Sequence, residues 1–118
     1  MTTIHRVTRR AAAGLLIAAA LSLTGVNLRA EDSATISISV KNHRFVPAEI
    51  QAPANKPLNL RIRNLDAAAM EFESVSLRVE KVVAANSEGV IKIRALAPGT
   101  YDFFDDFHQE TRGTLVIR

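Results

Sequence analysis

Short segments in which apolar and polar residues strictly alternate constrain the fold of this chain more than any other feature. The clearest are residues 35–40, 58–63 and 90–95. Successive side chains of a strand point to opposite faces, so alternation at a period of two predicts half-buried β-strands with their apolar residues inward. This period disfavours helix in these segments.

Turn-forming residues separate these strands from several shorter apolar runs. Pro53 closes one run, and Pro98 and Gly99 precede another. The shorter runs, also expected to be strands, are residues 49–52, 71–77, 80–84, 101–104 and 113–118. Residues 67–79 leave room for a helical turn. About seven short strands in a chain of this length predict one all-β domain, a β-sandwich with antiparallel or Greek-key pairing.

The first 30 residues have the order of a secretory signal. Arginines before residue 11 precede the apolar stretch 11–23, and Ala30 supplies a small residue at the cleavage point. The stretch has 13 residues, whereas a membrane-spanning helix needs about 20. We therefore expect a cleaved signal helix over residues 1–30 and an exported domain over 31–118. The chain would contact the membrane only if the signal stayed uncleaved as a tether.

Two details leave the export route open. Leu28 stands three residues before the expected cut, where a small residue is preferred, so cleavage a few residues away is an alternative. Arg9 and Arg10 form the pair that opens a twin-arginine signal, the alternative to the general secretory route.

Removing the signal reverses the charge of the chain. The whole sequence carries a formal net charge of +3, but its first 30 residues hold four arginines and no acid. Residues 31–118 therefore hold 11 basic against 12 acidic residues. This balance, with no cluster of basic residues, argues against a nucleic-acid partner.

The chain contains no cysteine. No disulfide can stabilise the exported domain, so burial of its core alone must hold it. A blue-copper electron-transfer centre needs a cysteine thiolate. Composition therefore excludes that centre.

The stretch 96–117 resembles the closing hairpin of cupredoxins, in which a Pro-Gly-x-Tyr-x-Phe strand leads into the copper loop Cys-x-x-His-x-x-Met-x-Gly. The matching positions are Tyr101, Phe103, His108 and Gly113. Asp105 stands at the cysteine position and Thr111 at the methionine position. The first copper-binding histidine of cupredoxins falls at about Met70. The resemblance implies a cupredoxin-like Greek-key sandwich without the usual copper ligands.

Further motifs resemble small periplasmic cupredoxin-like proteins related to the cupredoxin domain of EfeO-type iron-uptake systems. They read His43-Arg44-Phe45, Glu71-Phe72-Glu73-Ser74, Glu80-Lys81-Val82-Val83 and Phe104-Asp105-Asp106-Phe107-His108. The resemblance covers residues 34–118. It implies a periplasmic location, iron or copper handling, and a membrane iron permease as partner.

Imidazole and carboxylate groups recur at the loop and strand that this fold would bring together. Such a set suits Cu(II), iron, Mn or Zn. Glu71 and Glu73 lie two residues apart, so on a strand they share a face while Phe72 points to the other. The candidate metal ligands are His108, Asp106, Glu73, Glu71, Asp105 and Met70. Met70 has the alternative role of core filler, and the acidic loop has the alternative of a solvated surface.

These observations predict an exported, cupredoxin-like, metal-binding protein for copper or iron ions. We expect an accessory of iron or copper handling that catalyses no reaction, because the sequence shows no Ser-His-Asp pattern and no glycine-rich phosphate loop. The alternative is a metal-free sandwich whose acidic loop docks on a membrane permease or another periplasmic partner.

Overall fold

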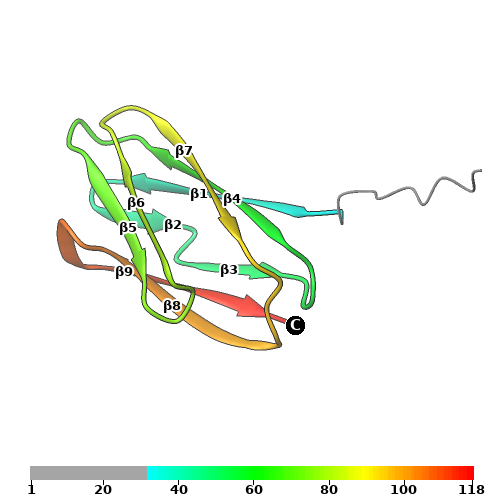
Figure 1. Cartoon of the computed structure of the whole chain (residues 1–118). Coiled ribbons are helices and arrows are strands. Elements are labelled where there is room, and N and C mark those ends of the chain that lie inside the picture. The colour runs from blue at the N-terminus through cyan, green and yellow to red at the C-terminus, as the bar shows by residue number, and fades with distance from the viewer. Residues whose placement is uncertain (1–31) are drawn as a thin grey trace, which may run out of the picture.

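Nine β-strands form two facing sheets in the computed structural model, which describes residues 32–118 (Figure 1). The first sheet has four strands, in the order β2 (Arg44–Val46), β1 (Ala34–Lys41), β4 (Leu58–Asn64) and β7 (Glu88–Ile93). The second has five, in the order β3 (Glu49–Ala52), β9 (His108–Ile117), β8 (Gly99–Asp105), β5 (Met70–Ser74) and β6 (Val79–Val83). The predicted signal segment lies outside the described residues.

The β-sandwich predicted from the alternating segments is confirmed. The strand β2 has three residues and was not predicted from alternation, because so short a run carries no periodic signal. The strand β9 begins at His108, five residues before the predicted start. Residues 75–78 form a hydrogen-bonded turn, and the described part of the chain contains no helix.

Two of the strand pairs are parallel. β1 pairs with β4 and β3 pairs with β9 in parallel, whereas the other pairs are antiparallel. The hydrophobic pattern fixes which face of a strand is buried but not the direction of its neighbour. The direction of a strand depends on how the chain reaches it, and between β1 and β4 the chain passes through β3 of the other sheet.

Apolar side chains from both sheets fill the space between them. Leu58, Leu60 and Ile62 of β4 are at most 1% exposed, as their alternation predicts. Phe103 of the second sheet stacks on Phe72, with ring centroids 4.9 Å apart. Phe45 of β2 meets Phe103 edge-on at 4.9 Å and so joins the first sheet to the second.

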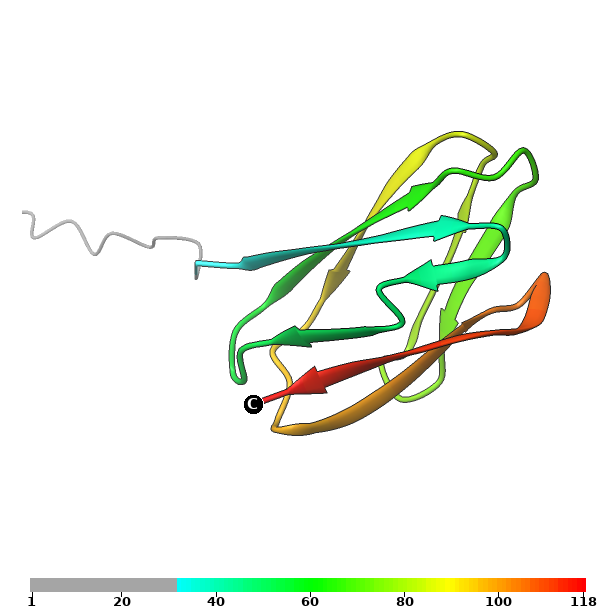
Figure 2. The ribbon, with the colours of Figure 1, turned by 180° about the vertical axis from the view of Figure 1, so that it is seen from behind.

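The turns β1–β2, β4–β5 and β8–β9 lie together at one end of the sandwich, opposite the C-terminus (Figure 2). Asn64 is fully buried at the end of β4, and its side-chain amide donates to the carbonyls of Ala68 and Val83. Its Oδ1 accepts the N–H of Asp66. Asp66 in turn accepts the N–H groups of residues 42 and 43, so the β4–β5 segment holds the β1–β2 turn in place.

All nine strands and the apolar core lie within residues 34–117. Residues 31–118 therefore contain both sheets and the core between them, so we expect them to fold without the N-terminal segment. No helix among residues 32–118 is long and apolar enough to cross a membrane.

Candidate metal site

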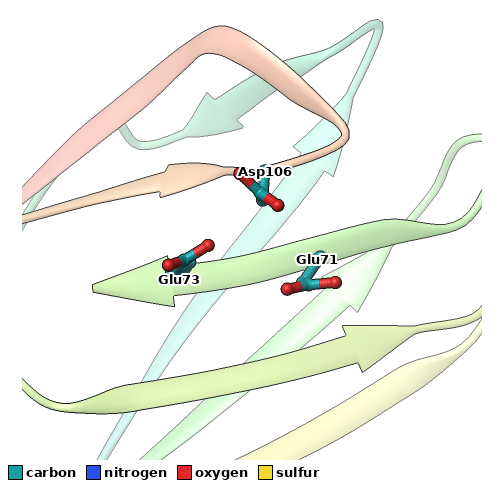
Figure 3. Close-up of side chains that lie close together, drawn as sticks. All are labelled: Glu71, Glu73 and Asp106. Carbon is teal, nitrogen blue, oxygen red and sulfur yellow. The ribbon is translucent and has the colours of Figure 1, made fainter. Parts of the chain in front are cut away.

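Three carboxylates converge on the outer face of the second sheet. Glu71 and Glu73 project from β5 to this face, while Met70, Phe72 and Ser74 between and beside them are buried. Asp106 begins the β8–β9 turn, where its N–H donates to the carbonyl of Glu71 at 2.8 Å. One oxygen from each of the three side chains lies within 4.8 Å of the others. Figure 3 shows the three side chains close together. We call Glu71, Glu73 and Asp106 the carboxylate group.

A fourth acid, Glu80, adjoins the carboxylate group. It lies on the edge strand β6 directly opposite Glu73. A hydrogen bond with Glu80, then burial, then the charges of Glu80, Asp106 and Glu73 raise the pKa of Glu71 from 4.5 to about 7. Burial and the charges of Asp106 and Glu80 also raise the pKa of Glu73. The raised pKa values mark a place where negative charge is crowded and a cation would be stabilising.

In the described part of the chain, no basic side chain forms an ion pair with these acids. Among residues 32–118 the ion pairs within 4.0 Å are His43–Asp66, Arg61–Glu88 and His108–Asp105, none of which includes the carboxylate group or Glu80. Like charges opposite one another on neighbouring strands destabilise a sheet. A bound cation would replace this repulsion by attraction.

The crowding predicts that the metal-free domain loses stability as pH rises. The pKa of Glu71 is about 7 in the folded chain against about 4.5 as an unperturbed group, so the folded state binds the proton more tightly. In chelator-treated protein, the free energy of unfolding should therefore decrease as the pH rises from about 4.5 to about 7. A Glu71→Gln variant, which carries no charge there, should be more stable than the wild type at pH 8. Urea unfolding across pH 5 to 8 measures both, and a wild-type profile that rises over this range contradicts the prediction.

Asp105 belongs to a different environment from its neighbour Asp106. Its side chain is fully buried, and its Oδ1 accepts the N–H groups of Glu71 and Phe107, each at 3.0 Å. Its Oδ2 lies 2.9 Å from Nδ1 of His108. These contacts use both carboxylate oxygens, so Asp105 anchors the β8–β9 turn instead of joining the carboxylate group.

His108 is placed away from the carboxylate group, against another histidine. Its ring and the ring of His43 from the β1–β2 turn have centroids 4.0 Å apart, with an angle of 35° between the planes. The side chains are 30% and 52% exposed, respectively. His43 Nδ1 lies 3.8 Å from Asp66 Oδ2.

The positions that hold copper in cupredoxins carry other contacts in this chain. Met70, at the first histidine position, is 1% exposed and belongs to the core. Asp105, at the cysteine position, binds His108 directly. Thr111, at the methionine position, donates its hydroxyl proton to the carbonyl of His43. The residues present thus do not fit a blue-copper centre.

The structure therefore brings together three of the six predicted ligands and separates the others. Glu71, Glu73 and Asp106 converge, whereas Met70 lies in the core and Asp105 and His108 bind each other. Glu80 was missed as part of the site. In the sequence, Glu80 is simply an acidic residue within a predicted strand. Only the pairing of β6 with β5 shows that it lies opposite Glu73.

Comparison with known proteins agrees with the observed fold. A model of the cupredoxin-like domain family matches residues 12–117. An uncharacterised protein of Rickettsia prowazekii (strain Madrid E) is 38% identical over 82 residues, which cover 70% of this chain and 66% of the relative.

Solved structures of copper proteins share the sandwich at low sequence identity. One is the metal-binding domain of the Cu(I)-exporting P-type ATPase CopA of Streptococcus pneumoniae D39, with a TM-score of 0.65 and 16% identity over 71% of this chain and 84% of that one. Another is auracyanin A, a blue copper protein of Chloroflexus aurantiacus, with a TM-score of 0.62 and 15% identity over 74% of this chain and 100% of that one. These likenesses extend to the fold.

Proposed function

The chain belongs to the cupredoxin-like domain family, and on this premise we propose that it is an exported protein that binds and passes on a metal ion through its carboxylate group. The observation that carries the proposal is the convergence of Glu71, Glu73 and Asp106 within 4.8 Å, with no basic counterion among residues 32–118. We propose that this site holds an ion without catalysing a reaction. The periplasm is the proposed compartment, because the first 30 residues have the order of an export signal.

The donor atoms point to a hard cation. Carboxylate oxygens suit hard metal ions, whereas thiolates and thioethers suit Cu(I). With Glu80 beside it, the carboxylate group offers up to four acidic side chains, a set that favours ferric iron over Cu(I). We propose ferric iron as the cargo, and Cu(II) as the copper species that competes for it.

The position of the site suits release of the ion. The carboxylate group lies on the outer face of a sheet, next to an edge strand, and Glu73 and Asp106 are partly exposed. The protons that compete for Glu71 near neutral pH would leave on binding and return on release. An accessory that delivers metal to a membrane permease needs both properties.

Removing one carboxylate should weaken ferric iron binding at least tenfold, about 1.4 kcal/mol. The variant is Glu73→Gln in residues 31–118, titrated with a soluble ferric chelate at pH 7 and followed by competition and thermal shift. Glu110→Gln is the matched control, because Glu110 is an exposed acid on the same β8–β9 hairpin as Asp106 but outside the carboxylate group. Equal binding by Glu73→Gln and the wild type would exclude the carboxylate group as the iron site.

A metal-free docking module is the second candidate function. Phe107 is 50% exposed beside Asp106, and Val82 is 55% exposed beside Glu80. Exposed apolar side chains next to acids are typical of protein contact surfaces. A domain that binds none of ferric iron, Cu(II), Mn(II) or Zn(II) would favour this function, with a basic partner surface such as that of a permease.

A further inference from the structure

His43 and His108 form a second constellation that the carboxylate group does not use. One comes from the β1–β2 turn and the other from the start of β9, 65 positions apart in the chain, yet their ring centroids lie 4.0 Å apart. Both rings reach solvent. They are the only histidines of residues 31–118.

Each ring has a carboxylate near its Nδ1 atom, but only the one beside His108 lies within hydrogen-bond distance. Asp105 Oδ2 lies 2.9 Å from Nδ1 of His108, and Asp66 Oδ2 lies 3.8 Å from Nδ1 of His43. Asp105 already accepts two backbone N–H groups, so it acts as the acceptor toward the ring. A neutral imidazole whose Nδ1–H faces a carboxylate keeps its lone pair on Nε2, as in metal-binding histidines of the carboxylate–histidine–metal type.

The backbone at His43 supports a role for its side chain. His43 has a φ of +55° and follows Asn42 at +51°, a two-residue hairpin turn of the kind that favours Asn-Gly. A non-glycine residue in this region costs of order 1 kcal/mol. Three contacts hold the strained turn: Asp66 accepts both of its N–H groups, and Thr111 donates to the His43 carbonyl.

We propose that His43 and His108 bind one Cu(II) ion through their Nε2 atoms, at a site separate from the carboxylate group. With metal–nitrogen bonds of about 2.0 Å and each nitrogen about 1.2 Å from its ring centre, two imidazoles at right angles on one ion have centroids about 4.5 Å apart. The observed centroid separation of 4.0 Å lies near this value, and the rings would turn from their present 35° tilt to bind one ion.

Copper is the ion that two such donors hold best. Cu(II) binds imidazole more tightly than the other divalent ions of the first transition row, and its square-planar geometry accepts two adjacent nitrogens with water in the remaining places. Zinc prefers four ligands in a tetrahedral site, and the carboxylates nearest these rings already accept hydrogen bonds from the backbone.

The test is Cu(II) titration of residues 31–118, with electron paramagnetic resonance at one equivalent. The wild type should show hyperfine splitting from two imidazole nitrogens. His43→Gly should show one nitrogen or none, with copper affinity at least tenfold lower. Glycine suits the positive φ of this turn, so the variant should keep or raise the melting temperature, and loss of folding does not explain the result.

A further variant separates this site from the iron site. Glu73→Gln should leave the nitrogen splitting intact, and His43→Gly should leave ferric iron binding intact. Oxygen-only copper coordination in the wild type, or a spectrum and affinity that His43→Gly does not change, would overturn the histidine site. Neither result would affect the test of the carboxylate group.

Discussion

An Asp105→Ala variant of residues 31–118 should lose about 3 to 5 kcal/mol of unfolding free energy, measured by urea denaturation. Asp105 is fully buried and accepts the N–H groups of Glu71 and Phe107 as well as facing the His108 ring. Alanine leaves these donors without a partner, and each unsatisfied buried donor costs about 1 to 3 kcal/mol. The β8–β9 turn that carries Asp106 would lose its anchor.

An exposed aspartate on the same strand provides the control. Asp102→Ala removes a carboxylate from β8 that points to solvent, so it should change the stability by about 0.5 kcal/mol or less. Asp105→Asn keeps the size of the side chain and one acceptor oxygen, and it should fall between the two. A loss below about 1 kcal/mol for Asp105→Ala would show that the turn does not depend on this carboxylate.

Replacing Gly113 by alanine should cost about 3 kcal/mol, at the upper end of what overpacking a core costs. An added Cβ would run into the ring of Phe103, and it would lie 2.9 Å from the carbonyl oxygen of Ala48. Phe103 has little freedom to move, because it is 1% exposed and stacks on Phe72. The melting temperature should fall by about 12 °C or more for a domain of this size.

Gly89 is the matched glycine for this experiment. A Cβ at Gly89 would approach Lys81 Cε at 3.0 Å and Val83 Cγ2 at 3.1 Å. The lysine chain is flexible and exposed, so Gly89→Ala should cost far less than Gly113→Ala. Similar melting temperatures for the two variants would mean that Phe103 moves aside more easily than its packing indicates.

The positions that bind copper in cupredoxins have structural roles in this chain. The first histidine position supplies a core methionine, the cysteine position a buried hydrogen-bond acceptor, and the methionine position a threonine that holds a neighbouring turn. The two metal sites that we propose lie on the outer face of the second sheet and at the pair of histidines, His43 and His108. The same end of the sandwich thus keeps its architecture while its ligands differ.

Sequence alone determined the alternating strands and their buried faces. Alternation at a period of two placed Leu58, Leu60 and Ile62 in the core and put Glu71 and Glu73 on one face, and the structure confirms both. These properties follow from strand geometry and the hydrophobic effect, which act residue by residue. The absence of cysteine likewise excludes a blue-copper centre on composition alone, because no other side chain supplies a thiolate.

Tertiary structure alone decided which polar groups meet. Asp105 and Asp106 are adjacent in sequence but lie in different environments. The side chain of Asp105 is buried, whereas that of Asp106 points to the outer face. Glu80 joins the carboxylate group through the register of β6 on β5, and His43 reaches His108 through the packing of two distant turns. Register and turn packing depend on contacts between residues far apart in the chain, which no local pattern records.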